Sequence, residues 1–432
     1  MKITEYYQGR PFRLWMGDIH SIIISDPETI REIFVKHCDN FINRIEMPSI
    51  SVVSSDYLSL SASSQPHWEK VKHVMIQAFT QLYKTKAKEI SVVKVEKFIH
   101  VLKLYTKSGE CFTPRRYCQT FVINIMLKFV VGKSINYTEV REDRELLDRL
   151  IKPMEDVFTH LGGHHLGDFV SFLQPLYLFY LENFNDPAAD LKKYIDEEIL
   201  KHQKTYDPDN HRDVLDLLLS NLDHVNGDLK TIRALLQDFL NSGTETTSTT
   251  LEWFFLAMAN NPDVQEKAYQ ELVKIADKET MLITYCQRQY TPYTNALIKE
   301  VMRKYPVLPI GLLRNCSNDI TINGTHIPKD TIVFQNLHYL FKSDRYWDQP
   351  NEFKPERFLE DNHSDIFHPF GVGPRLCVGQ SLANDILYMG IANVLLNFKI
   401  QSINAKQVDE TELFTLTVHP NLFQVSLKSR LY

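Results

Sequence analysis

The segment Phe370-Gly371-Val372-Gly373-Pro374-Arg375-Leu376-Cys377-Val378-Gly379 is the most informative stretch of this 432-residue chain. It contains the pattern F-x-x-G-x-R-x-C-x-G, in which glycines bend the chain and one cysteine comes just before a predicted helix. Backbone N–H groups and the helix dipole at such an N-terminus favour a negatively charged sulfur. The segment therefore predicts a thiolate site at Cys377.

A single thiolate on an open loop suits iron in a porphyrin better than it suits zinc. The porphyrin supplies four nitrogen ligands, so that the iron needs only an axial donor, whereas zinc needs further protein ligands nearby. The other cysteines are scattered and indicate neither a disulfide framework nor a zinc knuckle. The alternative interpretation of a lone cysteine is a small buried hydrophobic residue.

The composition is that of an intracellular globular protein. Hydrophobic residues make up 44% of the chain, and charges of both signs are mixed to give a formal net charge of −6. No nucleic-acid partner is expected, because that would require a basic stripe. No apolar run approaches the length of a membrane span, and Met1–Glu5 lacks the apolar core of a signal peptide, so the chain as given is expected to be soluble or peripheral.

The chain is expected to be mainly helical with a smaller β-rich part (α+β). Most of the segment 68–305 has apolar residues at helical spacing. Short apolar runs bounded by turn residues predict strands within about 10–25, 307–335 and 415–430. No linker divides the chain, so we expect residues 1–432 to form a single domain.

Two segments of the helical part depart from ordinary patterns. Half of the positions from 49 to 64 are serine, which predicts a mobile loop of the kind that often binds ligands. The segment Leu229–Asn260 predicts one helix of some thirty residues, about 45 Å long. Its centre, Asn241-Ser242-Gly243-Thr244-Glu245-Thr246-Thr247, is polar where a buried helix should be most apolar. A local rule broken in this way usually marks a functional site.

The cysteine segment resembles the haem-binding loop of the cytochrome P-450 family, and the similarity extends over nearly the whole chain. In that family the matching cysteine is the axial ligand of the haem iron, which implies this role for Cys377, with Phe370 and Gly379 as further cofactor-binding residues of the loop. The resemblance implies the family's fold, with haem b (iron protoporphyrin IX) between the long helix of Thr246 and the loop of Cys377. It also implies an oxidoreductase that acts as a haem-thiolate monooxygenase.

Two further elements of the family occur in the expected order. Glu300 and Arg303 match E-x-x-R on a helix, and Arg357 lies in Phe353-Lys354-Pro355-Glu356-Arg357-Phe358, which resembles P-E-R-F. By this resemblance the three side chains form a buried ion network that supports the cysteine side of the haem and does no chemistry. Taken alone, E-x-x-R would be a solvated helix pair.

The polar centre of the long helix resembles the family's motif [AG]-G-x-[DE]-T-[TS]. The match implies that Glu245 and Thr246 are the acid–alcohol pair that delivers protons while dioxygen is reduced. The alternative for Thr246 is a hydroxyl that bonds back to its own helix. Ser242 replaces the usual small apolar residue of the motif.

The resemblance also implies that cations face the two haem propionates. Trp68 and Lys72 match W-x-x-x-R with lysine in place of arginine, which keeps one charge but loses the bidentate fork. Arg314 and Arg375 match the family's other propionate-binding positions.

The family's partners are implied in the same way. Electrons would come from NADPH through a separate NADPH–cytochrome P-450 reductase, with cytochrome b5 as an optional second donor, because the chain has no flavin or iron–sulfur motif. The substrate is expected to be small and apolar, together with O2. An acidic reductase would be attracted by a locally basic stretch, although a solvated helix face explains these residues almost equally well. The stretch comprises Lys70, Lys72, His73, Lys84, Lys86 and Lys88.

Microsomal members, which this chain most resembles in its cysteine loop, carry an N-terminal anchor helix that this sequence lacks. We therefore expect a cytosolic protein, a peripheral one at the endoplasmic reticulum membrane surface, or a sequence without its first several dozen residues.

Two rival functions remain. One is a haem-thiolate isomerase or dehydratase, which Glu245 and Thr246 disfavour, since such chemistry needs no proton relay. The other is a non-catalytic haem-binding sensor, which predicts a second protein ligand on the iron.

Overall fold

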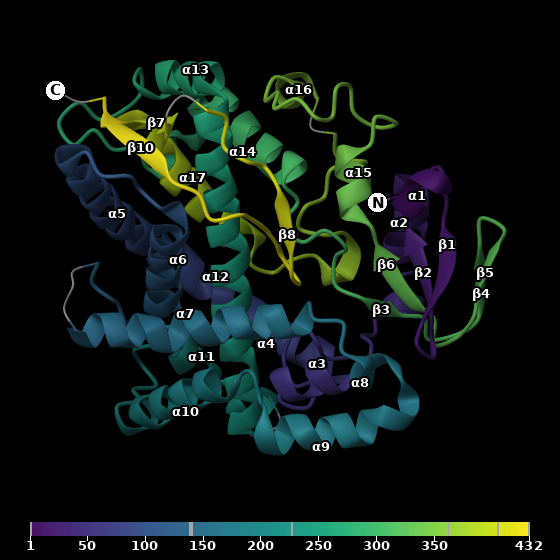
Figure 1. Cartoon of the computed structure of the whole chain (residues 1–432). Helices are drawn as coiled ribbons and strands as arrows, with labels where there is room; N and C mark the ends of the chain where they lie inside the picture. The colour runs from purple at the N-terminus through teal and green to yellow at the C-terminus, as the bar shows by residue number, and fades with distance from the viewer. Residues whose placement is uncertain (1, 138–140, 226–227, 362, 404–405, 431–432) are drawn as a thin grey trace.

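The computed structural model describes residues 2–137, 141–225, 228–361, 363–403 and 406–430. The helices are α1 (Lys2–Tyr6), α2 (Pro27–Arg31), α3 (Pro48–Val53), α4 (His67–Leu82), α5 (Lys88–Ser108), α6 (Pro114–Val131), α7 (Arg141–Leu161), α8 (Leu166–Phe169), α9 (Gln174–Phe184), α10 (Ala189–Lys204), α11 (Val214–Ser220), α12 (Leu229–Asn260), α13 (Pro262–Leu272), α14 (Pro292–Lys304), α15 (Leu337–Lys342), α16 (Arg357–Glu360) and α17 (Gln380–Asn397). Most of them are grouped around α12, and a small sheet lies at one side of this group (Figure 1). The prediction of a mainly helical α+β fold is confirmed.

The strands are short and form separate small sheets. They are β1 (Phe12–Met16), β2 (Ile19–Ile24), β3 (Arg314–Asn315), β4 (Ile320–Ile322), β5 (Thr325–Ile327), β6 (Ile332–Gln335), β7 (Phe398–Ser402), β8 (Glu412–Phe414), β9 (Val418–Pro420) and β10 (Val425–Ser429). The largest sheet has the order β1-β2-β6-β3, and β7–β10, β4–β5 and β8–β9 are two-stranded. In the largest sheet β2 pairs parallel with β6, with Ile22 opposite Val333. The N-terminal hairpin is thereby joined to the segment that follows α14.

The long helix has the predicted bounds, and α12 spans 32 residues from Leu229 to Asn260. Asp228 caps its start by accepting a hydrogen bond from the backbone N–H of Lys230. Gly243, which weakens a helix in isolation, lies where α6 comes closest. A Cβ atom at this position would lie only 2.5 Å from the terminal methyl carbon of Met126. The glycine is therefore explained by close packing of α12 against α6.

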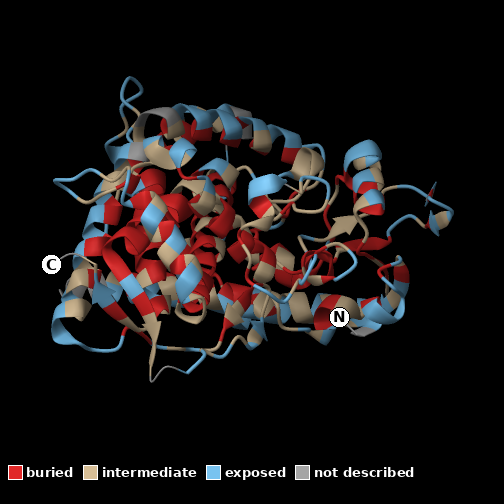
Figure 2. Cartoon of the chain, turned by 90° about the horizontal axis from the view of Figure 1, so that it is seen from above, coloured by how far each residue is buried: buried red, intermediate tan, exposed pale blue. Residues whose placement is uncertain are grey.

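The apolar core has a large helical part and a smaller part under the sheet. The larger cluster joins side chains of α4, α5, α6, α12 and α17. The smaller one contains Ile22 and Ile24 of β2, Val333 of β6 and Leu337 of α15. Figure 2 shows the buried residues gathered in the interior of the helical part. Within the described ranges, no helix is both long and apolar enough to cross a membrane.

Two predictions about local structure are wrong. The serine-rich segment 49–64 is not a loop throughout, because its first residues belong to α3 and most of its serines are buried. Hydroxyl groups fold this segment through local bonds, as when Ser54 Oγ donates to the carbonyl of Ile50 at 2.6 Å. Near the C-terminus, the strands β7 and β8 lie outside the predicted ranges.

Candidate active site

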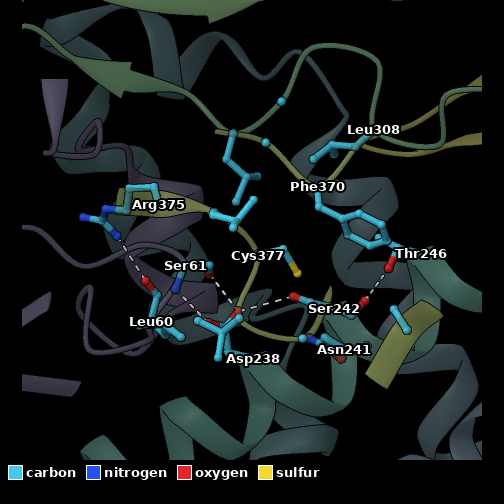
Figure 3. A pocket seen from close by; sticks show the side chains of 18 of the residues that line it. Leu60, Ser61, Asp238, Asn241, Ser242, Thr246, Leu308, Phe370, Arg375 and Cys377 are labelled. Carbon is cyan, nitrogen blue, oxygen red and sulfur yellow. Dashed lines mark hydrogen bonds between the residues drawn. The ribbon is translucent and has the colours of Figure 1, made fainter. Parts of the chain in front are cut away.

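The cysteine loop and α12 both line one cavity of about 410 Å³. Cys377 lines it from the loop and Thr246 from the helix (Figure 3). Apolar side chains make up most of the wall, among them Val157 of α7, Leu308 and Leu416. Cavities of roughly 300–1,000 Å³ with apolar walls are typical of small-molecule sites. The structure therefore brings the two most important predicted residues to one such site.

The shape of the cysteine loop depends on its glycines. Gly371 and Gly373 have φ values of 82° and 72°, which residues with a side chain rarely adopt. A Cβ atom at Gly373 would lie 2.0 Å from the carbonyl oxygen of Phe34. The backbone N–H of Cys377 donates to the carbonyl of Phe370 at 3.0 Å and closes the loop. These constraints direct the thiol of Cys377 into the cavity, beside Phe370 (Figure 3).

The surroundings of the Cys377 thiol act on its pKa in opposite directions. Burial among protein atoms raises the pKa above its ordinary value, and the carboxylate of Asp238 acts in the same sense. The backbone N–H groups of Gly379 and Gln380, at the start of α17, lower it. The thiol of Cys377 is exposed to the cavity, and a cation placed there at the sulfur would favour the thiolate. The site therefore fits a metal ion such as haem iron at Cys377.

Trp68 of α4 lies between two of the predicted cations. The guanidinium carbon of Arg375 is 4.1 Å from the centre of the Trp68 ring, and Lys72 Nζ is 4.6 Å from it. Lys72 also donates to the carbonyl of Pro374 at 2.8 Å, so it reaches the cysteine loop. Lys72, which stands where the family has arginine, thus lies at the same edge of the cavity as Arg375.

Arg314 and Arg375 share this edge of the cavity with Arg44, which the sequence analysis did not identify. Arg44 donates to the carbonyls of Ser61, Leu312 and Leu313 at 2.7–2.9 Å. Burial lowers the pKa of Arg375, and the neighbouring charge of Arg44 lowers it further. Among the described residues, none of the three arginines forms an ion pair with a carboxylate. This cationic edge fits the two carboxylates of a haem, and no local motif distinguishes Arg44 from an ordinary surface arginine.

The residues of the predicted ion network lie together behind the site. Glu300 and Arg303 are 0% exposed, and their side chains bond through two contacts of 2.7 and 2.9 Å. Arg357 Nε lies 3.2 Å from the same carboxylate. Arg303 also donates to the carbonyl of Phe341 at 2.8 Å. The network is therefore closed entirely by groups of this chain.

The structure separates the two residues of the expected acid–alcohol pair. Thr246 Oγ1 faces the cavity and donates to the carbonyl of Ser242 at 2.8 Å, which is the back-bonding that was considered as an alternative. Glu245 does not line the cavity and is almost completely buried. Consecutive helix residues point in different directions, which explains the separation. The structure therefore gives no direct contact between Glu245 and the cavity.

Glu245 is instead held by β9, through a histidine that the sequence analysis did not identify. His419 Nε2 lies 2.8 Å from Glu245 Oε1, and its Nδ1 lies 3.9 Å from Glu252 on the same helix. Burial lowers the pKa of His419, but the hydrogen bond to Glu245 and the negative charges of the two glutamates outweigh it and raise the pKa to about 9. Thr417 Oγ1 also donates to Glu245 at 3.1 Å. His419 is thus an imidazolium between two carboxylates.

The basic stretch that was considered for partner docking is reduced in the structure. Lys72 is directed to the cavity edge, and Lys86 donates to the carbonyls of His211 and Arg212 at 2.8 and 3.0 Å. Lys70 and His73 remain exposed on α4. The side chains of Lys84 and Lys88 lie outside the part that the structure describes.

Comparison with known proteins identifies the class to which this fold and site belong. Residues 1–427 match the family described as Cytochrome P450. The chain therefore belongs to the cytochrome P450 family, whose members are haem b proteins that act in general as monooxygenases. The predicted family, enzyme class and cofactor are thereby confirmed.

Particular relatives come from Dictyostelium discoideum. The protein named "Probable cytochrome P450 508A1" is 36% identical over 436 residues, which cover 100% of this chain and 88% of the relative. "Probable cytochrome P450 508C1" is 33% identical over 441 residues, covering 100% of this chain and 89% of the relative. A solved zebrafish cytochrome P450 with progesterone has the same fold, with a TM-score of 0.86 at 23% identity over 99% of this chain and 98% of that one.

Proposed function

We propose that this protein inserts one oxygen atom of O2 into a small, largely apolar organic substrate. The balanced reaction is RH + O2 + NADPH + H⁺ giving ROH + H2O + NADP⁺, with NADPH supplying both electrons. The observation that carries the proposal is the shared cavity, where a thiol, a helix hydroxyl and a cationic edge surround one enclosed space. Histidine is absent from the described lining, which disfavours a sensor closed by a second imidazole ligand.

Cys377 is proposed as the axial ligand of haem b, with Phe370 and Gly379 shaping its loop. Haem b supplies the redox-active iron at which dioxygen is reduced. The N–H groups of Gly379 and Gln380 are directed at the sulfur and support its negative charge. Arg44, Arg314, Arg375 and Lys72 would hold the two propionates, with Trp68 as the surface against which Arg375 and Lys72 pack.

Thr246 is proposed as the last proton donor on the chain before the reacting oxygen. Its hydroxyl donates to the carbonyl of Ser242, which leaves the oxygen's lone pairs free to accept a proton from the cavity side. Glu245, which does not line the cavity, would supply protons to Thr246. For this, the contact between Glu245 and His419 would first have to break. The ion network of Glu300, Arg303 and Arg357 has a structural role only.

The partners in this proposal are a separate NADPH–cytochrome P450 reductase and, as an optional donor, cytochrome b5. Lys70 and His73, which are exposed on α4, would form part of the docking face.

We propose that residues 1–432 act as one haem domain and that the protein contacts the endoplasmic reticulum membrane peripherally. Exposed apolar side chains from α8 to α9 support that contact, namely Leu166, Phe172, Leu176, Phe179, Tyr180 and Phe184.

The test is an oxygen-isotope experiment with the haem-loaded protein. It is incubated with NADPH, the reductase, ¹⁸O2 and a mixture of lipophilic hydrocarbons, ethers and alcohols, and products are identified by mass spectrometry. We expect a product that carries one ¹⁸O atom and whose formation requires both NADPH and the reductase. Products that form without the reductase would indicate an isomerase or dehydratase, and the absence of any product would favour a haem-binding protein without activity.

A matched pair of variants sharpens this test. Thr246→Val is expected to keep NADPH consumption but to lose most of the labelled product, because reduction continues without controlled proton delivery. Thr244→Val serves as the control, since Thr244 is on the same helix but does not line the cavity. Equal product yields from both variants would exclude the proposed role of Thr246.

A further inference from the structure

Two carboxamide side chains in the cavity wall have unused hydrogen-bonding capacity. Gln237 and Asn241 of α12 line the cavity, and they are only 3% and 5% exposed. Within the described part of the chain, neither Gln237 Oε1 nor Asn241 Oδ1 has a hydrogen-bond partner. Buried polar atoms without partners are rare in folded proteins and call for a specific explanation.

The orientation of Gln237 is determined by the protein. Its Nε2 donates to the carbonyl of Val53 at 2.7 Å, so the amide cannot turn over without losing this bond. The free atom is therefore the oxygen, which can only accept. The carboxamide of Asn241 makes no hydrogen bond with a described residue, so it can present either its oxygen or its nitrogen to a ligand.

The two carboxamides lie next to each other. They are four residues apart on α12, which puts them on one helix face about one turn from each other. Asn241 is the neighbour of Ser242, and both are seen beside the cysteine loop in Figure 3. Apolar residues of α7, including Val157, Phe158 and Leu161, line the same cavity. The result is a small polar spot within a mostly apolar wall.

The neighbouring polar groups of α12 are satisfied by the protein. Asp238 accepts hydrogen bonds from the backbone N–H and the hydroxyl of Ser61, both at 2.7 Å, and from Ser242 at 3.4 Å (Figure 3). Thr246 donates to its own helix. Thr244, on the same face of α12, also has a buried hydroxyl without a partner among the described residues, but it does not line the cavity. Among the described residues of α12 that line the cavity, the buried side-chain atoms without a partner are therefore those of the two carboxamides.

We propose that the substrate is an apolar molecule with one hydroxyl group, and that this hydroxyl binds to Gln237 and Asn241. The hydroxyl donates to Gln237 Oε1, and its oxygen accepts from Asn241 Nδ2 once the carboxamide of Asn241 has turned over, so that its nitrogen takes the place of the oxygen that lacks a partner. A ketone or ether has no proton for Gln237, and a carboxylate has none either. The inference rests on the proposed function, since it names the substrate class of that same site.

The hydroxyl contact selects the substrate and also positions it. A site built to bond a hydroxyl rejects the analogue that lacks it, because the protein's polar atoms are then left buried and unpaired. Asn241 precedes Thr246 by five residues, or about 7.5 Å along the helix. The bound hydroxyl therefore lies away from Thr246, so that the carbon to be oxidised is a different one on the same skeleton.

The test uses three compounds on each of three skeletons, namely the hydrocarbon, the alcohol and the methyl ether of adamantane, biphenyl and dodecane. Affinity for the haem-loaded protein is measured from the change in the haem absorption band. For the skeletons that bind, we expect the alcohol to bind at least about tenfold more tightly than the hydrocarbon and the ether, as the loss of a buried hydrogen bond predicts. The preference should fall to about threefold or less in Asn241→Leu and Gln237→Met.

Thr244→Val is the matched control. Thr244 Oγ1 is also buried without a partner among the described residues, but it does not line the cavity. This variant is therefore expected to keep the full preference for the alcohol. A loss of preference in Thr244→Val equal to that in Asn241→Leu would show a general effect on the helix and would contradict the inference.

Equal binding of alcohol and hydrocarbon by the unmodified protein would overturn the inference, because water would then satisfy the carboxamides. The absence of binding by any of the three alcohols would also overturn it. The carbon monoxide spectrum of the same preparation is recorded alongside. A normal thiolate spectrum with no alcohol preference rejects the substrate class alone, whereas an abnormal spectrum rejects the proposed function.

Discussion

Two groups of buried arginines in this molecule differ in how their charge is balanced. Arg303 and Arg357 share the carboxylate of Glu300, at distances of 2.7 and 3.2 Å. Arg44 and the half-buried Arg314 and Arg375 bond to backbone carbonyls or lie against rings, and none of them forms an ion pair with a described carboxylate. The single nearby carboxylate that acts on them among the described residues is Asp238, whose charge raises the pKa of Arg44. A buried charge that the protein balances itself serves the fold, whereas one left without a counter-ion marks the place of a charged ligand.

The same contrast holds for neutral amides. Gln265 of α13 is completely buried, and both ends of its amide are bonded, with Nε2 donating to the carbonyls of Met258 and Ile400 and Oε1 accepting from the N–H of Ile400. Gln237 is almost as buried, but its oxygen has no partner among the described residues. The amide of Gln265 joins two elements of the fold, whereas the oxygen of Gln237 is available for the ligand contact that we propose.

The first prediction concerns Arg303 and Arg357, whose charges are balanced by Glu300. Glu300→Ala leaves two buried guanidinium groups unpaired, which should cost about 3–5 kcal/mol of unfolding free energy. Thermal or urea denaturation of the haem-free protein measures it. Asp156→Ala, which removes the exposed ion pair with Lys152, is the control and should leave the midpoint almost unchanged. A small effect of Glu300→Ala would show that the network does not support the fold.

The second prediction concerns the group without a counter-ion. Arg375→Met should weaken haem binding by roughly 2–3 kcal/mol, because a charged hydrogen bond to the ligand is lost. The stability of the haem-free protein should change less than the haem affinity, since removal of the repulsion between Arg375 and Arg44 offsets part of the loss of the hydrogen bonds from Arg375 to the carbonyls of Ile42 and Leu60. Haem transfer to a scavenging globin gives the affinity. If the haem-free protein lost stability while its haem affinity stayed constant, Arg375 would serve the fold, as Arg303 and Arg357 do, and would not bind haem.

The third prediction concerns how stability depends on pH through His419, whose charge is balanced by carboxylates. Burial lowers the pKa of His419, but the hydrogen bond to Glu245 and the charges of Glu245 and Glu252 outweigh it and raise the pKa from about 6.5 to about 9. The contribution of His419 to stability is therefore complete below about pH 6.5 and is lost as the pH rises through about 9. Its magnitude is ~2 kcal/mol, less than the full pKa change would give, because the ring is partly exposed to solvent. His419→Gln should lack this loss in urea denaturation across that range. Parallel pH profiles for both proteins would disprove the charged state.

The fourth and smallest effect comes from Lys72→Arg. An arginine can form a bidentate contact with a carboxylate that lysine cannot, so haem should be retained more firmly by about twofold to fivefold. The same haem-transfer assay measures this change. Weaker retention would mean that the bond from Lys72 to the carbonyl of Pro374 matters more than its charge.

Sequence patterns were sufficient to predict those elements whose shape depends on residues close together in the chain. The bounds of α12 follow from a cap at Asp228 and from an asparagine and proline at its end. The cysteine loop follows from glycines and a helix start. By contrast, the fold of residues 49–64 depends on Asp238, which accepts both hydrogen bonds of Ser61 from far along the chain. Such a partner cannot be inferred from a serine-rich composition.

Side-chain directions and distant partners also limited the prediction of the site. The motif places Glu245 next to Thr246 in the sequence, but only the packing of β9 against α12 shows that Glu245 turns to His419. Arg44 and His419 carry no motif of their own, and they acquire importance only from groups that the fold brings to them. Gln237 and Asn241 were found in the same way, because an unmet hydrogen bond is visible only in three dimensions.

The most direct test of the account is the carbon monoxide difference spectrum of the reduced, haem-loaded protein, recorded for the unmodified chain and for Cys377→Ser. The account predicts a Soret maximum at about 450 nm that disappears in the variant, as expected for thiolate ligation by Cys377. A maximum at about 420 nm in freshly folded protein would indicate a neutral or histidine ligand and would contradict the central claim.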